Sequence, residues 1–171
     1  MSKRISKGEE LWKMGKIMIK KISNIEEAIK CLELVSVTFK KFQMPEYSED
    51  GVRNFYDFIN VENFFPQIKN DEISLYGYFN DSQLIGVLGI RKPNHLCLLF
   101  VDEKFHKRGI AKQLFSNWLE ENRYNLEFVT VNSSLYAVEM YRKLGFSGSS
   151  SIKENDGIKY VPLVFTLDKL S

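Results

Sequence analysis

The sequence is poor in cysteine and lacks long apolar runs. Its 171 residues include only two cysteines, Cys31 and Cys97, whose separation suits neither a zinc site nor a redox pair. We therefore expect two reduced core thiols and no metal site. No apolar stretch is long enough to cross a bilayer, and no signal-peptide core follows the basic N-terminus. These absences predict a cytoplasmic protein without a membrane partner.

An excess of either charge is also missing. The 24 basic and 22 acidic residues give a formal net charge of +2, and 7 of the basic residues but only 2 of the acidic ones fall within residues 1–21. The remaining 17 basic and 20 acidic residues leave the body of the chain with a net charge of −3. A nucleic-acid-binding protein would need a basic face with interleaved aromatic residues, so the charge pattern argues against that class. A cationic amine suits a mildly acidic body better.

The length and the apolar content of 44% predict one domain with a substantial core. Residues 1–15 are polar, interrupted by glycine and without hydrophobic periodicity, so we expect a basic leader that is either disordered or not part of the native protein. Residues 16–171 are then expected to form a single domain. Neither an internal repeat nor a low-complexity linker divides them.

Two helices are expected near the start of this domain, after a strand at residues 17–22. Asn24 and Glu27 form a capping-box pattern, and the first helix is expected to run to Phe42. Ser48 is expected to cap the second helix. The predicted buried faces consist of Ile25, Ala28, Ile29, Leu32 and Phe39 in the first helix, and of Val52, Phe55, Tyr56 and Ile59 in the second.

From about residue 73 the apolar period shortens to that of a strand, which indicates a sheet. Residues 73–79 and 84–91 flank a hairpin turn, and the nearly continuous apolar run at 95–101 predicts a strand buried on both faces. A helix at 109–123 and a strand at 127–131 follow, so the run and this strand should form a parallel pair with a right-handed crossover. A ligand is expected at that pair. The remaining elements are expected to be a helix at 134–144 and two strands at 146–153 and 159–167.

The apolar run at 95–101 leads through a short basic loop directly into the next helix. Backbone N–H groups of such a loop and of the first helical turn converge with the positive end of the helix dipole, and they favour an anion such as a pyrophosphate. Gly109 lets the backbone approach the anion, and the small Ala111 keeps the helix start open. The segment predicts a phosphate-bearing cofactor, with an ordinary strand-to-helix turn as the alternative, and the P-loop and dinucleotide glycine motifs are absent. Three basic side chains add positive charge: Lys107, Arg108 and Lys112.

Two segments resemble the signatures of the GNAT superfamily of N-acetyltransferases. The run His106-Lys107-Arg108-Gly109-Ile110-Ala111 resembles the cofactor motif Gln/Arg-x-x-Gly-x-Gly/Ala, with His106 in place of the usual first residue. The run from Asn132 to Phe146 resembles the later motif Asn-x-x-x-x-Ala-x-x-x-Tyr-x-x-x-Gly-Phe. The two motifs have the family's order and spacing, and the resemblance covers about residues 16–168.

The resemblance implies a fold and a cofactor. The fold is mixed α/β (α+β), with a central, mostly antiparallel sheet of about seven strands that contains one splayed parallel pair and is flanked by about four helices. The cofactor is acetyl-CoA, which is the co-substrate, and Asn132 would contact it or a water. Its acetyl-pantetheine end would meet the backbone of Leu99, Phe100 and Val101. Its pyrophosphate would meet His106, Lys107, Arg108, Gly109, Ile110, Ala111 and Lys112.

The resemblance also implies the reaction, which is the transfer of an acetyl group to a primary amine by direct attack within a ternary complex. Tyr141 would be the general acid for the departing thiolate, whereas a packed core aromatic is its purely structural interpretation. His95 is a candidate base because of its intrinsic pKa, although a lone histidine is more often structural. Glu46 and Asp102, acting through water, are the alternatives.

The acceptor is expected beside the two early helices, with Glu46 and Tyr47 as candidate substrate-binding residues. Glu46, Glu49 and Asp50 can attract a cation, although a solvated, helix-capping cluster is the simpler interpretation. A small-molecule amine and a protein amine both stay open as acceptors, and so does a homodimer. The main rival function is a non-catalytic acyl-CoA-binding sensor or interaction domain.

Overall fold

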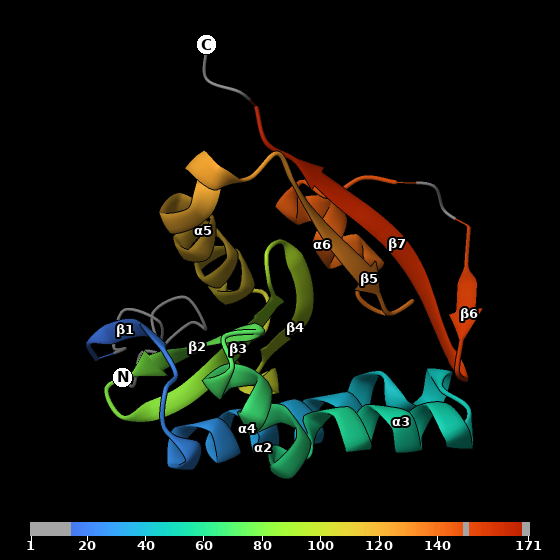
Figure 1. The fold of residues 1–171 in the computed structure, drawn as a ribbon, viewed down its shortest axis with the longest axis horizontal. Coiled ribbons are helices and arrows are strands. Elements are labelled where there is room, and N and C mark those ends of the chain that lie inside the picture. Colours follow the sequence, from blue (N-terminus) through green and yellow to red (C-terminus); the bar gives the residue numbers. More distant parts are fainter. Residues whose placement is uncertain (1–14, 149–150, 169–171) are drawn as a thin grey trace, which may run out of the picture.

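The structure is a computed structural model in which residues 15–148 and 151–168 are described (Figure 1). The expected leader lies outside these residues except for Gly15. Three short 3-10 turns are η1 (Met44–Glu46), η2 (Glu103–Phe105) and η3 (Arg123–Asn125). The described residues form seven strands and five helices in the order β1 (Ile17–Lys21), α2 (Ile25–Phe42), α3 (Glu49–Ile59), α4 (Val61–Lys69), β2 (Ile73–Asn80), β3 (Gln83–Arg91), β4 (His95–Val101), α5 (Ile110–Asn122), β5 (Phe128–Ser133), α6 (Val138–Leu144), β6 (Lys153–Asn155) and β7 (Ile158–Thr166).

The strands form one sheet in the order β1-β2-β3-β4-β5-β7-β6. Neighbouring strands run antiparallel except β4 and β5, which are parallel and are connected through α5. The predicted fold class is therefore confirmed, including the single parallel pair. Antiparallel neighbours are joined by hairpins at the turn after Asn80 and at Asp156-Gly157, as the turn residues predict.

The helices divide between the two faces of the sheet. In Figure 1 α2, α3 and α4 lie together along one side, whereas α5 and α6 lie on the other. Two hydrophobic clusters match this division: one is built around Phe39 of α2 and Phe64 of α4, and the other around Leu114 of α5 and Tyr141 of α6. The molecule is therefore a sheet with a core on each face.

One helix was not expected from the sequence. Pro66 interrupts the helical pattern of residues 61–69, and a proline inside a helix removes a backbone hydrogen bond. The segment is nevertheless helical, because the Asn60 side chain caps it by accepting from the Glu62 N–H at 2.8 Å, and Phe64 anchors it in the core with no exposed surface. The structure thus has five helices among its described residues where about four were expected.

Three other expectations need correction. In α2 Ile25 and Ile29 are 46% and 37% exposed, and the buried stripe runs instead through Cys31 and Val35 beside the expected Ala28, Leu32 and Phe39. The helix expected from residue 134 begins only at Val138. Of the strand expected at 146–153, residues 149–150 lie outside the described residues. In the rest, Ser147 makes one isolated bridge to Val164, and β6 covers Lys153–Asn155.

Within the described part of the chain, no helix combines the length and the apolar character that a membrane span requires.

Candidate active site

The central feature of the sheet is a gap between its two parallel strands. β4 and β5 pair only at His95 with Thr130 and at Leu96 with Val131, and beyond these pairs the strands separate. The cause lies in β4, where Leu96 pairs with Ile90 and Leu98 with Gly89, so that Cys97 is an extra residue. Such a bulge bends the strand that carries it. The backbone edge of β4 beyond Leu96 is therefore not paired with β5.

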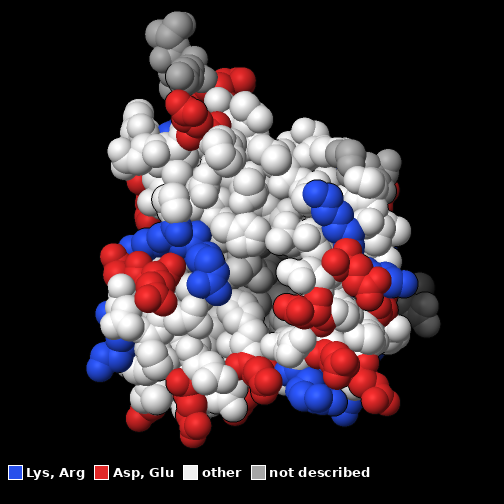
Figure 2. Space-filling view, turned by 45° about the vertical axis from the view of Figure 1, so that its right-hand side comes forward, with Lys and Arg blue, Asp and Glu red and all other residues white. Residues whose placement is uncertain are grey.

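A cavity of about 70 Å³ occupies this gap, which we call the cleft. Residues 43–55 of the helical layer close it on one side. In Figure 2 the molecule is hollowed near its centre, with basic side chains to the left of the hollow and acidic ones to its right. The cleft is lined by Gln43, Tyr47, Phe55, Leu96, Cys97, Leu99, Phe100, Val131, Asn132, Ser134, Ala137 and Tyr141.

The loop between β4 and α5 presents backbone donors at the end of this cleft. Lys107 and Gly109 both adopt left-handed backbone conformations, with φ of 61° and 79°. Alternating right- and left-handed residues turn successive N–H groups toward one point, and the first N–H groups of a helix have no partner within the helix. Space before Gly109 is open, because a Cβ placed there would meet nothing within 4 Å. The first turn of α5 also carries no acidic residue. The loop can therefore bind an anion, and Lys107 and Lys112 are exposed beside it.

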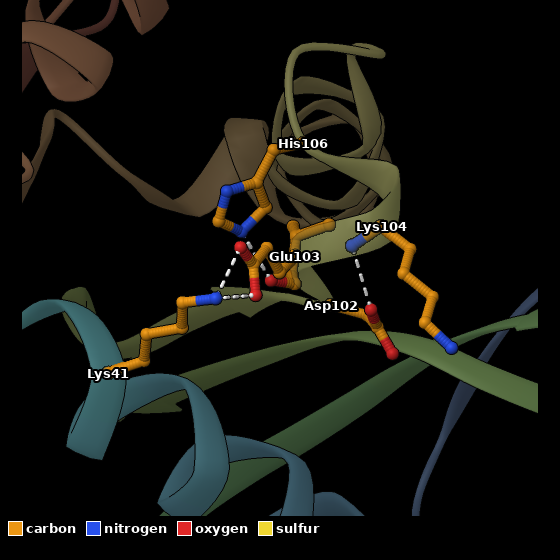
Figure 3. Close-up of polar contacts among 6 residues, drawn as sticks. Lys41, Asp102, Glu103, Lys104 and His106 are labelled. Carbon is orange, nitrogen blue, oxygen red and sulfur yellow. Dashed lines mark hydrogen bonds and ion pairs between the residues drawn. The ribbon is translucent and has the colours of Figure 1, made fainter. Parts of the chain in front are cut away.

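The His106 side chain of this loop turns inward, as Figure 3 shows. Its Nε2 lies 2.6 Å from the Val101 carbonyl oxygen, and its ring centroid lies 5.2 Å from that of Phe42. Lys41 forms an ion pair with Glu103 at 2.5 Å, and the Asp102 side chain accepts from the Lys104 N–H at 2.9 Å (Figure 3). These contacts hold the loop against the end of α2. His106 therefore fixes the shape of the loop with its side chain.

Tyr141 lies at the bottom of the cleft. It sits on α6 one turn after Ala137, whose carbonyl accepts its backbone N–H at 3.1 Å, and its ring packs edge-on against Phe146 with centroids 5.5 Å apart. Burial raises the pKa of the Tyr141 phenol, and the neighbouring Cys97 and Tyr47 raise it further. The hydroxyl therefore stays protonated at neutral pH and can donate a proton.

Two further ionisable groups share the cleft with Tyr141. Burial raises the pKa of Cys97 to about 12, and burial together with Glu46 raises the pKa of Tyr47 to about 12. Both groups are therefore protonated donors at neutral pH. Sequence reasoning assigned Cys97 to the core and did not consider Gln43 or Ser134, although all three line the cleft.

The remaining candidates are divided between the cleft and its surroundings. Asn132 lines the cleft, directly after Val131, the last residue of β5 that pairs with β4, and Tyr47 lines it from the opposite layer. The Glu46 carboxylate accepts from the Tyr136 N–H at 3.4 Å. His95 does not line the cleft: it lies at the paired end of β4, where its Nδ1 is 2.8 Å from the Thr130 hydroxyl. The structure thus brings Tyr47, Asn132 and Tyr141 together and leaves His95 apart.

A larger cavity of about 480 Å³ lies elsewhere, between α2 and residues 102–104. Its walls include Val37, Leu84 and several solvent-facing lysine and glutamate side chains, and none of its residues belongs to either sequence motif. Size alone therefore does not identify the site. Within residues 15–148 and 151–168, no group of three or more His, Cys, Asp and Glu side chains is arranged to hold a metal ion.

Comparison with protein families identifies the class of this fold and site. The model of the acetyltransferase (GNAT) domain family matches residues 43–167, which is most of the chain. The chain therefore belongs to the GNAT acetyltransferases, a family of acyltransferases that use acetyl-CoA. None of the curated proteins compared with the chain matches it.

Solved structures with the same fold include a GCN5-related N-acetyltransferase from Rhodopseudomonas palustris, with 14% identity, a TM-score of 0.74, and coverage of 90% of this chain and 98% of that one. The PaiA N-acetyltransferase from Thermoplasma acidophilum, solved in complex with coenzyme A, has 20% identity and a TM-score of 0.71, with coverage of 89% and 99%. The apo form of YjaB from Escherichia coli has 21% identity and a TM-score of 0.66, with coverage of 88% and 97%. At these identities the similarity shows the shared fold.

Proposed function

We propose that the protein transfers an acetyl group from acetyl-CoA to a primary amine, which attacks the thioester directly in a ternary complex. The observation that supports this most strongly is the position of the protonated Tyr141 hydroxyl in a cleft that begins at the unpaired edge of β4. The cleft contains no Ser-His-Asp or Cys-His arrangement among the described residues, and direct attack requires none.

The β4–α5 loop is the proposed site for the diphosphate of acetyl-CoA. Backbone N–H groups of residues 107–112 would bind the phosphate oxygens, since the His106 N–H already donates to the Glu103 carbonyl oxygen at 3.2 Å. Lys107, Arg108 and Lys112 would supply positive charge. The unpaired backbone of Leu99–Val101 would hydrogen-bond the pantetheine arm. Asn132 faces that arm from β5. PaiA, which shares this fold, was solved in complex with coenzyme A, and this supports coenzyme A as the ligand of this chain.

Two groups of the cleft are proposed to act on the reacting atoms. A backbone N–H of the bulged segment near Leu99 or Phe100 would polarise the thioester carbonyl, and one such donor contributes about 3 kcal/mol to transition-state stability. Tyr141 would give its proton to the departing thiolate, and the attacking amine would lose a proton to water, so that the products are an amide and the free thiol of coenzyme A. Burial raises the pKa of Tyr141, so the phenol holds its proton at neutral pH. Tyr47 and Glu46 are proposed to bind the acceptor from the opposite side.

Two measurements test this proposal. Calorimetry should detect binding of coenzyme A, and a thiol-release assay with acetyl-CoA and a panel of amines should detect turnover. Tyr141→Phe should lower kcat by about 100-fold or more, because general acid catalysis is removed, and should leave the affinity for coenzyme A unchanged. Tyr124→Phe is the matched control, since that side chain is 86% exposed and does not line the cleft.

The outcomes separate the proposal from its rivals. Binding of coenzyme A without thiol release from any amine would favour a non-catalytic sensor. Turnover that survives Tyr141→Phe unchanged would remove the assigned acid. A folded protein without affinity for coenzyme A would overturn the proposal altogether.

A further inference from the structure

The connection between α2 and α3 crosses the cleft. We call residues Phe42–Ser48 the strap. At one rim the Phe42 ring lies 5.2 Å from the His106 ring, and at the other rim it stacks on Tyr136 with centroids 5.2 Å apart and an interplanar angle of 23°. The Glu46 carboxylate also accepts from the Tyr136 N–H. The strap therefore contacts both the loop after β4 and the loop after β5.

The end of the strap is fastened to the β6–β7 hairpin. The Ser48 N–H and hydroxyl both donate to the Gly157 carbonyl oxygen, at 3.3 and 3.1 Å, and the Asn54 side-chain amide donates to the Asp156 carbonyl oxygen at 3.1 Å. The two backbones touch, because a Cβ on Gly51 would lie 2.4 Å from the Gly157 carbonyl oxygen. Contacts between residues about one hundred positions apart thus close the cleft on the side of α2 and α3.

We propose that the strap restricts the acceptor to a primary amine at the end of an unbranched carbon chain. This inference rests on the proposed function and deepens it by naming the substrate class. It excludes amines on a branched carbon, which include the α-amines of all amino acids except glycine and of protein N-termini that do not begin with glycine. It admits linear alkylamines and lysine side chains.

The size of the cleft carries this inference. Its volume of about 70 Å³ is far below the roughly 300–1,000 Å³ of ordinary ligand pockets. The thioester of bound acetyl-CoA would take part of that space, and the rigid rings of Tyr47, Phe55 and Phe100 form part of the cleft wall. Phe39 stacks on Phe55 with centroids 4.0 Å apart and is fully buried, so the ring wall is supported from behind. A methyl group on the carbon that bears the amine would meet this wall.

Two isomeric amines test the inference on the full-length protein. n-Butylamine and sec-butylamine have the same composition and nearly the same basicity, but only the second is branched at the carbon that bears nitrogen. Thiol release should give a kcat/KM for n-butylamine that is at least about 10-fold higher, because a misplaced methyl group in a tight pocket has effects of this size.

A single added methyl group should relax this preference. Gly51→Ala places a Cβ against the Gly157 carbonyl and so pushes the hairpin from α3, while alanine suits the helix. We expect faster hydrogen exchange of the Ser48 amide and a fall of the n-butyl to sec-butyl ratio by about fivefold or more. Arg53→Ala, on the same helix and 69% exposed at its side chain, should keep the wild-type ratio. Asn54→Ala is a second, milder way to loosen the same contact.

The outcomes distinguish this inference from the proposed function. Equal rates for the two amines in the wild-type protein would overturn the strap as a selector while leaving the acetyltransferase intact. An unchanged ratio in a variant whose Ser48 amide exchanges faster would overturn it too. Bound coenzyme A without thiol release from these two amines or from any other amine of the panel would instead contradict the proposed function.

Discussion

The two faces of the sheet differ in how far their hydrophobic cores extend. On the α5–α6 face one cluster reaches from Tyr76 on β2, through Leu99 on β4, to Leu163 on β7, and so crosses the gap between the parallel strands. On the other face the cluster around Phe39 and Phe64 is confined to α2–α4 and strands β2–β4, together with Ile22 after β1. Among the described residues, a buried hydrophobic cluster therefore reaches across both halves of the sheet on the α5–α6 face and not on the other.

This difference explains how a gap can persist inside a stable sheet. On the α5–α6 face, Phe115 lies with its ring centroid 5.3 Å from those of both Phe146 and Phe165, so α5 is packed on residues of the far half. On the opposite face, the strap is the connection that spans the cleft. A core that crossed on both faces would fill the space that the substrates need.

The largest expected effect comes from removing a phenylalanine on each face. Phe115→Ala and Phe64→Ala should each lower the free energy of unfolding by about 3–5 kcal/mol, because both rings are almost fully buried. Only Phe115→Ala should also weaken coenzyme A binding, by about 10-fold or 1.4 kcal/mol, because the loss of this ring lets the two halves of the sheet move relative to each other. Urea unfolding and calorimetry measure the two quantities.

Phe64 serves as the control for this comparison, since it lies in the cluster that stops before the cleft. Its variant should bind coenzyme A with wild-type affinity under conditions in which it is folded. Equal losses of affinity in the two variants would show that both faces set the width of the gap, which would contradict the comparison.

A smaller effect is expected at two glycines on the α5–α6 face: Gly109, which precedes α5, and Gly145, which follows α6. Gly145 has φ of 110°, and a Cβ there would lie 2.9 Å from the Phe165 ring. Gly145→Ala should cost about 1–3 kcal/mol through backbone strain and this clash. Gly109→Ala, with no atom within 4 Å of the added Cβ, should cost only about 1 kcal/mol, from its left-handed backbone. Thermal unfolding distinguishes them, and equal costs would rule out the clash as a cause.

The sequence predicted the α5–α6 face of the sheet better than the α2–α4 face, which carries the strap. The strand, glycine and helix at 95–123 depend on local signals: a continuous apolar run, a left-handed glycine and a regular buried stripe through Ile110, Leu114 and Trp118. The structure bears out each of these. The resemblance to the family motif singled out Tyr141, which lies one helical turn after Ala137 and lines the cleft.

The α2–α4 face depends on contacts between distant residues, which no local sequence pattern predicts. The Cys97 bulge is visible only from the register with β3, and the contact of Ser48 with Gly157 joins segments far apart in the chain. The helix that contains Pro66 forms because tertiary burial of Phe64 outweighs the lost hydrogen bond. Local helix or strand propensity does not predict such tertiary contributions.

A weaker, pH-dependent effect on the free energy of unfolding is expected at the start of α2. A hydrogen bond from Lys20 lowers the pKa of the Glu27 carboxyl below its usual 4.5, burial opposes this, and Asn24 lowers it further. Stability from this group is therefore present above pH 4.5 and is lost as the pH falls through the lowered value. Glu27→Gln should cost at most about 1 kcal/mol at neutral pH, because water screens the pair, and nothing at low pH.

Unfolding at a series of pH values measures this difference. Glu26→Gln, one residue away on the exposed side of the same turn, is the matched control and should show no comparable change with pH. A cost for Glu27→Gln that stays constant below pH 4 would mean that the side chain stabilises by packing and not by its charge.

The smallest expected effect concerns His95, which lies where the two halves are still paired. Its Nδ1 contacts the Thr130 hydroxyl at 2.8 Å, and burial, followed by the charge of Arg91, lowers its pKa. Because a general base in contact with its substrate contributes 100-fold or more, a residue outside the cleft should contribute less than about threefold to kcat/KM. His95→Gln, which can still hydrogen-bond Thr130, should leave the pH–rate profile unchanged. A tenfold fall with a shifted acidic limb would instead assign His95 as the base, acting through water that reaches from the paired end of the strands into the cleft.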